Sequence, residues 1–305
     1  MFLRALSLLI VFFISSAANA WNTTGQLIVS ELALQQLSPA KQRYFEQLTF
    51  RALKQMEAQK RLYLMRTFDN PSSFAQLSVF PDELRNMTLN RLYEQYADKV
   101  PVSLAPFAED TTAHWHSINQ HFQLTANTSH CENDPTENIV SILPVLLDAF
   151  REASSDDSKA LTLAFITHLV ADVHNPLNTI SKVDEDCESD RHRNRICVAY
   201  RSGSRSCEQT LQQAWESGVG LFEDFENVAE AVEQLARVNV DEDMAAQLDA
   251  DIWAKEGFDL ARLVYAVKPG ERLDPFYLEE GKIIAVQRVT LAAARLAAIL
   301  DQLYP

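Results

Sequence analysis

The chain contains little glycine and little proline, with 7 Gly and 11 Pro in 305 residues. Average usage is about 7% for Gly and about 5% for Pro, so residues that form turns are scarce. No stretch rich in Pro, Gly or Ser divides the chain, and we therefore expect one domain over residues 21–305 rather than several. Scarcity of turn-forming residues favours long helices. We predict an all-α fold, a single domain of many helices joined by long loops.

Apolar residues recur with the 3.6-residue period of a helix along most of the chain. The widest apolar stripes lie at 139–150 and 161–173 with a polar turn between them, so we predict two helices packed against each other. We find no clear strand pattern and no internal repeat. The other predicted helices lie at 25–37, 41–58, 90–97, 208–221, 227–237, 243–266 and 281–303.

Basic residues are outnumbered, because 27 Lys and Arg stand against 42 Asp and Glu and give a net charge of −15. Such a surface repels nucleic acid at long range. Any phosphate chemistry would therefore need metal ions to offset the negative charge locally. The acidic surface is equally consistent with a role in solubility alone.

Residues 1–20 are expected to be a cleaved secretory signal peptide. Arg4 is their one charge, an apolar run covers 6–14, and residues 18–20 have the small-x-small pattern that precedes a cleavage site. The run is too short to cross a bilayer, which takes about 20 apolar residues, and we find no later apolar stretch of that length. We expect a secreted or periplasmic protein with no membrane span. Its mature chain would begin with the free amine of Trp21, a group that can chelate a metal.

Four cysteines are present, an even number in a chain expected to be exported, and this combination predicts disulfides. Three pairings are possible. Zinc ligation by cysteine is the alternative, but none of the spacings resembles C-x-x-C. The four are Cys131, Cys187, Cys197 and Cys207.

Residues with metal chemistry concentrate at 167–178. His168 and Asp172 are four residues apart, so on a helix they share one face with Cβ atoms about 5–6 Å apart. Imidazole and carboxylate are ordinary zinc ligands, and two from one helix need only two partners from elsewhere. An isolated pair of this kind is more often structural, but the surroundings are apolar and a buried carboxylate needs a partner. His174 would point elsewhere on the helix, to pack or to support a ligand.

Two further segments carry candidate ligands. Residues 114–121 hold three of the seven histidines, among them His116. A cluster of this kind is also compatible with surface decoration. Asp82 follows an apolar turn, where the helix dipole favours a carboxylate without any catalytic role.

Taken together and in order, these pieces resemble zinc-dependent single-strand-specific nucleases of the S-one/P-one type, which share a fold with bacterial zinc phospholipase C. The resemblance covers most of the chain after residue 20. The matching segments are Trp21 with Gly25, Asp82-Glu83-Leu84-Arg85, Trp115-His116-x-Ile118-Asn119, Thr167-His168-x-x-x-Asp172-x-His174-x-Pro176-Leu177, Asp190-Arg191-x-x-Asn194 and Leu211-x-x-x-Trp215-Glu216-Ser217-Gly218.

The resemblance implies a phosphodiesterase that uses three zinc ions. Its buried zinc would be held by Asp82, His116, His168 and Asp172. Asp82 would also orient the attacking hydroxide. The second zinc would be bound by Trp21, through its amine and carbonyl, and by Asp172. The family has a further histidine where this chain has Gln26, and a neutral amide binds zinc poorly beside imidazole.

The third zinc position departs further from the family. Asn178, Gln212 and Glu216 stand where two histidines and an aspartate would be expected. Amide oxygens suit calcium or magnesium better than zinc. Ser117 replaces an aromatic residue that stacks a nucleobase in the family, and Asn119 is a further candidate for a metal or substrate contact. One zinc is therefore expected, with the second in doubt and the third lost.

Two functions follow as hypotheses. The first is an exported, monomeric zinc-dependent phosphodiester hydrolase, an endonuclease acting on single-stranded nucleic acid or nucleotides, weakened or altered in its substrate. The second is a catalytically degenerate relative, in which one structural zinc holds the helices together and the cleft binds a partner. A phospholipase C-like enzyme ranks third, because the acidic surface offers no attachment to anionic membranes.

Overall fold

The computed structural model describes residues 21–305 except 55–57, 124–130, 132–135, 191–195 and 200–208. Within these residues the chain forms fourteen α-helices, four 3-10 helices and four strands of two or three residues. The predicted all-α fold is thus confirmed. The expected signal peptide lies outside the described residues and stays a prediction.

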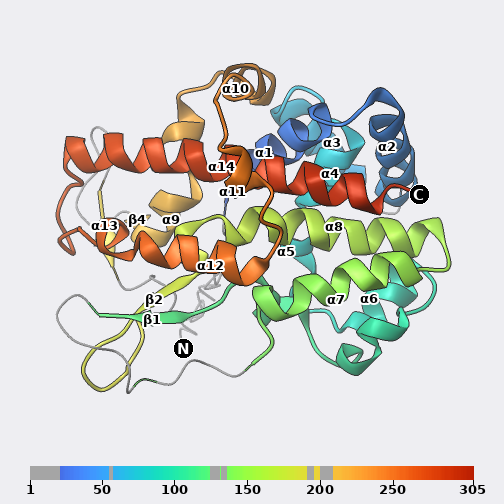
Figure 1. Cartoon of the computed structure of the whole chain (residues 1–305), viewed down its shortest axis with the longest axis horizontal. Coiled ribbons are helices and arrows are strands. Elements are labelled where there is room, and N and C mark those ends of the chain that lie inside the picture. The colour runs from blue at the N-terminus through green and yellow to red at the C-terminus, as the bar shows by residue number, and fades with distance from the viewer. Residues whose placement is uncertain (1–20, 55–57, 124–130, 132–135, 191–195, 200–208) are drawn as a thin grey trace, which may run out of the picture.

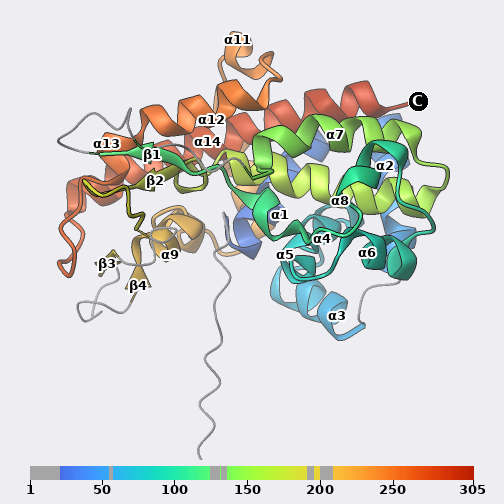
Figure 2. The same ribbon diagram turned by 90° about the horizontal axis from the view of Figure 1, so that it is seen from below.

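The longest helix, α14 (Pro275–Leu303), runs most of the length of the molecule. In both views α13 (Ala261–Val264) lies near its start and α2 (Pro39–Leu53) near its end (Figures 1 and 2). The other α-helices are α1 (Thr23–Gln35), α3 (Ala58–Thr67), α4 (Ser73–Ser78), α5 (Pro81–Leu84), α6 (Leu89–Tyr96), α7 (Ile139–Glu152), α8 (Asp156–Val173), α9 (Leu211–Glu216), α10 (Val228–Leu235), α11 (Glu242–Ala245) and α12 (Ala250–Asp259). The 3-10 helices are η1 (Val102–Phe107), η2 (Thr112–His116), η3 (Pro176–Asn178) and η4 (Leu221–Glu223).

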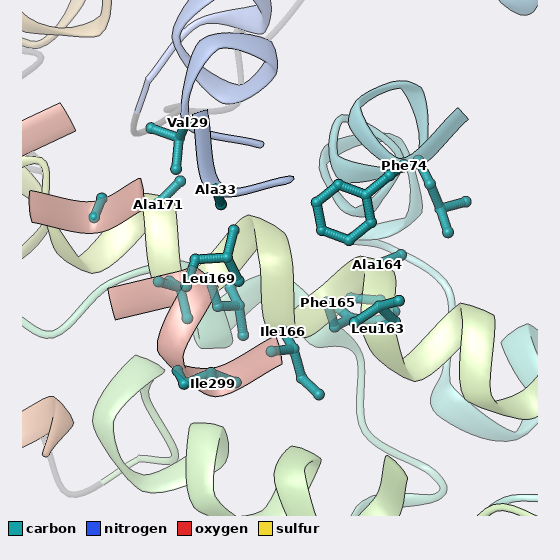
Figure 3. Packing of buried hydrophobic residues seen from close by; sticks show 14 of the residues in the cluster. Val29, Ala33, Phe74, Leu163, Ala164, Phe165, Ile166, Leu169, Ala171 and Ile299 are labelled. Atoms are coloured by element: carbon teal, nitrogen blue, oxygen red, sulfur yellow. The ribbon is translucent and has the colours of Figure 1, made fainter. Parts of the chain in front are cut away.

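Helix α8 lies at the centre of the core. Every residue from Ala160 to Val173 is buried, as is typical of a helix that is apolar on all sides. It packs against α7, α2 and α14. Figure 3 shows side chains of α8 among those of α1, α4 and α14, represented by Val29 and Ala33, Phe74, and Ile299. Any polar group between Ala160 and Val173 is therefore placed inside the protein.

The helices predicted at 243–266 and 208–221 differ from the structure, because local capping or backbone geometry interrupts them. The helix predicted at 243–266 is divided into α11, α12 and α13. The carboxylates of Asp241 and Asp249 accept backbone N–H groups and start new helices at those positions. The helix predicted at 208–221 ends at Glu216, since residues 218–220 have positive φ angles of 63°, 55° and 91°, which a right-handed helix does not accommodate.

Two small strand pairs were not predicted. β1 (Gln120–Phe122) pairs in parallel with β2 (Ile180–Lys182), and β3 (Cys197–Val198) pairs antiparallel with β4 (Gln209–Thr210). Strands of two or three residues are too short for an alternating pattern to show in the sequence. The β1–β2 pair joins the segment after η2 to the segment after α8, which brings two parts of the candidate site together.

The expectation of disulfides is confirmed for three of the four cysteines. Cys131 bonds to Cys187, and Cys197 is also disulfide-bonded. Cys207 lies outside the described residues. A cysteine in a disulfide has no free thiolate, so these three residues do not bind zinc.

Helix α14 corrects one expectation. We expected no apolar stretch after residue 20 long enough to cross a membrane, yet an 18-residue window of α14 has a mean hydropathy of 1.7. However, 72% of that window is buried inside the protein. The helix therefore has the burial of a core helix.

Two buried arginines join α14 to α12 and to the end of α8. Arg288 and Arg295 donate to the carboxylate of Glu256 at 2.6–2.8 Å. Arg288 Nε also donates to the carbonyl of His174 at 3.1 Å, and Arg295 Nη1 lies 2.9 Å from His174 Nε2. Burial would raise the pKa of Glu256, but the hydrogen bonds from the arginines outweigh it and lower the pKa.

The Glu256→Gln substitution should lower the free energy of unfolding at pH 7 by about 2 kcal/mol, the size of a hydrogen bond to a charged group. Because the folded-state pKa is lowered, this stabilisation is complete above the ordinary value of about 4.3. It is lost as the pH falls through the folded-state pKa. Thermal melts of both proteins between pH 7 and pH 3 should show a difference that shrinks below about pH 4.

The control for this experiment is Glu233→Gln. Glu233 pairs with Arg237 on the surface, with both side chains 71% exposed, and exposed pairs contribute at most about 1 kcal/mol. Equal losses in the two variants would contradict a special role for the buried arginines.

Candidate metal centre

Four side chains from three parts of the chain converge on one point. His168 and Asp172 lie one turn apart on α8, and both are fully buried. His116 is the last residue of η2, and Asp82 lies in the first turn of α5, directly after Pro81. Proline is favoured at that position because its fixed φ suits a helix start.

The two imidazoles face each other between the two carboxylates. His116 Nδ1 lies 3.1 Å from His168 Nε2. Asp172 Oδ2 lies 2.9 Å from the first nitrogen and 3.1 Å from the second. Asp82 Oδ1 lies on the outer side, 3.9 Å from His116 Nδ1 and 3.5 Å from His168 Nε2. Among the described residues, Asp82, His116 and His168 form a group whose ligand atoms all lie within 4.8 Å of one another.

These separations fit a zinc ion. Zinc bonds of about 2.0–2.1 Å in a tetrahedron place ligand atoms about 3.3–3.4 Å apart, and the five distances above, from 2.9 to 3.9 Å, bracket that value. Two imidazoles and two carboxylates are also a donor set that zinc accepts. The charges of the two carboxylates would balance those of a dication.

Electrostatics support the same interpretation. Burial lowers the pKa of His116 to about 4, with a further contribution from the charge of Arg85. Burial disfavours the charged form of His168 too, but Asp172 and Asp82 outweigh it and raise the pKa to about 10. Burial would raise the pKa of each carboxyl group, yet the charge of His168 lowers it. The carboxylates thus hold a proton on His168, and a metal ion would displace that proton.

Hydrogen bonds orient the ring of His168 and hold the backbone of His116. His168 Nδ1 lies 2.8 Å from the carbonyl of Ser78, at the end of α4. This contact assigns the proton to Nδ1 and leaves Nε2 as the ligand atom. The amide of Asn178 donates to the carbonyl of His116 at 3.0 Å, and Ile118 N–H donates back to the carbonyl of Asn178 at 2.8 Å. The end of η2 is therefore tied to η3 in front of β1 and β2.

Arg85 is a charged member of the site that we did not single out from the sequence. Its Nε and Nη2 atoms lie 3.0 and 2.5 Å from Asp82 Oδ1. The sequence did contain a signal for it, because Asp82 and Arg85 are three residues apart and can meet within one helical turn. Both belong to the segment that matches the family, but we assigned no role to the arginine. Asp82 and Arg85 have side chains that are 20% and 11% exposed, whereas His168 and Asp172 are fully buried. The centre is therefore reached from the side of Asp82 and Arg85.

At the second predicted zinc position, a hydrogen bond lies where a second ion would bind to Asp172. Gln26 is buried, and its Nε2 donates to Asp172 Oδ1 at 2.6 Å. A hydrogen-bond donor thus occupies the carboxylate oxygen that a second ion would need. Trp21 is also buried and packs against Phe222 with ring centroids 5.7 Å apart.

The third predicted zinc position also lacks its donor set. Asn178 uses its amide to hold His116, as described above. Gln212 is fully buried and Glu216 half-buried, four residues apart on α9. The three residues are amides and one carboxylate, so they do not fit zinc.

The remaining sequence candidates lie around the centre rather than in it. His174 Nδ1 lies 2.7 Å from the carbonyl of Val170 and its Nε2 faces Arg295, so this residue packs at the end of α8. Ser117 directly follows His116 in an extended conformation. Asn119 is half-buried in the segment between η2 and β1. Zinc binding by the converging residues stays a prediction.

Comparison with known proteins agrees with this geometry. A sequence model of the family described as S1/P1 Nuclease matches residues 21–305. The match begins at Trp21 and includes all four residues of the centre as well as Arg85. A search of the curated proteins found no match. Because the family match extends over nearly the whole chain, this chain belongs to the S1/P1 nuclease family.

Proposed function

We propose that this chain is a zinc-dependent phosphodiester hydrolase that acts on single-stranded nucleic acid or on nucleotides. The observation that carries the proposal is a group of two imidazoles and one partly exposed carboxylate, with a second, buried carboxylate against both imidazoles. Membership of a nuclease family supports the reaction class. Asp82, His116, His168 and Asp172 would hold a single zinc ion.

The residues of the centre divide into a buried and an exposed set. Zinc held there would supply Lewis-acid polarisation of the phosphoryl group and a more acidic water for the attack. Asp172 and the two histidines are closed to solvent, so they can only hold the ion. Asp82 is partly exposed, and its carboxylate can accept a hydrogen bond from the attacking water and orient it.

Arg85 is placed to bind the phosphate of the substrate. Two of its nitrogens are held against Asp82 Oδ1, and a guanidinium has five N–H donors in a fork that matches phosphate. Its charge would offset the charge that builds up on the phosphoryl oxygens during attack. In a chain with a net charge of −15, this local positive charge also lowers the repulsion of an anionic substrate.

We propose export of the chain through the signal peptide at residues 1–20. The family match starts at Trp21, and the Cys131–Cys187 disulfide is typical of an oxidising compartment. Cleavage before Trp21 would leave a buried aromatic residue at the N-terminus of the mature chain.

A second candidate function is that of a degenerate binding protein with one structural zinc. The replaced residues favour it, because Gln26 and Asn178 act as hydrogen-bond donors and Ser117 has no ring to stack on a base. Base stacking contributes about 1–3 kcal/mol per base. This alternative predicts zinc binding without turnover.

Zinc should stabilise the protein through this centre. Free zinc at 100 times its dissociation constant is expected to stabilise the folded state by about 2.7 kcal/mol. His168→Ala, which removes a buried ligand, should abolish the rise in melting temperature that zinc produces. The matched control is the exposed His114→Ala, which should keep it. A zinc response of normal size in His168→Ala would contradict the assignment.

Turnover separates the two candidate functions. Zinc-loaded protein should hydrolyse single-stranded DNA or RNA, a 3′-nucleotide or bis(p-nitrophenyl) phosphate, and a chelator should remove the activity. If the protein retains zinc and hydrolyses none of these, the hydrolase proposal fails and the binding function replaces it.

Arg85→Ala should lower kcat by about 10²–10³, as expected for loss of a charged group that stabilises the transition state. The kcat of Arg85→Lys should lie between those of Arg85→Ala and the wild type, since lysine keeps the charge but not the planar fork. Zinc content should be unchanged in both variants. Arg91 is exposed on α6 and provides the control substitution to Ala. Equal kcat values for Arg85→Ala and the wild type would remove Arg85 from the mechanism.

A further inference from the structure

Asp172 uses its two carboxylate oxygens in two different directions. Oδ2 faces the ligand nitrogens of His116 and His168 at 2.9 and 3.1 Å. Oδ1 accepts the Nε2–H of Gln26 at 2.6 Å. Asp172 is 0% and Gln26 1% exposed, so water does not compete for either contact.

The chemistry of the two groups assigns the orientation of the Gln26 amide. With the amide turned over, Oε1 would lie against a carboxylate oxygen, and two acceptors would meet with no proton between them. The N–H therefore faces Asp172. Gln26 Oε1 is then left buried without a hydrogen-bond partner. The charge-assisted bond to Asp172 accounts for this orientation of the amide.

The backbone that carries the Gln26 side chain is held in place. Gln26 N–H donates to the carbonyl of Asn22 at 3.1 Å, and its own carbonyl accepts from Ser30 Oγ at 2.8 Å. The preceding residue, Gly25, is packed so closely that a Cβ there would lie 2.6 Å from the ring of Phe222. This end of α1 is therefore a rigid support for the amide.

We propose that Gln26 restricts the metal centre to one ion, by donating to the Asp172 oxygen through which the carboxylate would otherwise bridge to a second ion. A second cation at Oδ1 would have to displace a buried N–H and would meet an amide, a weak ligand for zinc. Gln26 is thus a positioning residue that keeps Asp172 Oδ2 directed at the two histidines. This inference rests on the zinc centre of the proposed function.

The proposal is tested by counting metal in purified protein that begins at Trp21, loaded with zinc and dialysed. Elemental analysis should find one zinc per chain in the wild type. Gln26→His exchanges the N–H donor for a ring nitrogen that can bind metal beside Asp172 Oδ1, and it should raise the count to two. Gln26→Ala adds no ligand, so the count should stay at one, with zinc affinity weakened about 10–100-fold by loss of the support to Asp172.

Two further variants keep the result interpretable. Gln76→His changes another buried glutamine, whose amide donates to the carbonyl of Pro71, and should leave one zinc. If Gln26→His does not fold, as judged by circular dichroism, Gln26→Glu keeps the size of the side chain and supplies a carboxylate beside Asp172. It should bind two ions and show a melting temperature that depends more strongly on zinc than that of the wild type.

The outcomes separate this inference from the proposed function. Two zinc ions in the wild type would overturn it, as would one zinc in folded Gln26→His and Gln26→Glu. Absence of zinc from the wild type would overturn the proposed centre itself. One zinc in the wild type and two in either Gln26 variant would support the inference, whether or not the enzyme turns over.

Discussion

A charged carboxylate lies inside the core of this protein, and the arrangement of the site follows from the need to satisfy it. Asp172 sits on α8, which is buried at every position from Ala160 to Val173, and is closed to solvent. Desolvation of an ion is costly unless donors or a cation compensate for it. The compensation comes from three directions: Gln26 on α1, His116 at the end of η2 and His168 on α8 itself. These contacts require the N-terminal helix, the central helix and the loop before β1 to meet at one point.

Two positions at which the family resemblance leads one to expect metal ligands hold amides that donate hydrogen bonds into the remaining centre. Gln26 donates to the side chain of Asp172 and Asn178 to the carbonyl of His116. A hydrogen bond from an amide N–H compensates part of the desolvation cost of a buried carboxylate, although the amide carries no charge. The ligands of the second and third zinc positions are therefore replaced by residues whose hydrogen bonds hold Asp172 and His116 in place. The same residues that weaken the case for a three-zinc enzyme support a centre with one ion.

Positive charge is scarce in this chain, and part of it is placed inside. Arg288 and Arg295 are buried around Glu256 and contact His174, at the C-terminal end of α8. Arg85 is nearly buried beside Asp82. These guanidinium groups hold charged or polar partners in fixed positions within an otherwise acidic protein. Where the centre is nearest to solvent, the guanidinium of Arg85 is the positive charge, paired with the carboxylate of Asp82.

The sequence by itself determined the all-α class, the buried helix at 161–173 and the shared face of His168 and Asp172, because periodicity and four-residue spacing are local properties. The tertiary structure decided the rest. Gln26 and Asp172 are 146 residues apart, so the direction of the amide depends on how α1 packs on α8, and no local pattern encodes it. The sequence left open whether His174 supports a metal ligand. In the structure its ring contacts Arg295 on α14 instead. Contacts between distant segments depend on packing and are therefore visible only in the folded chain.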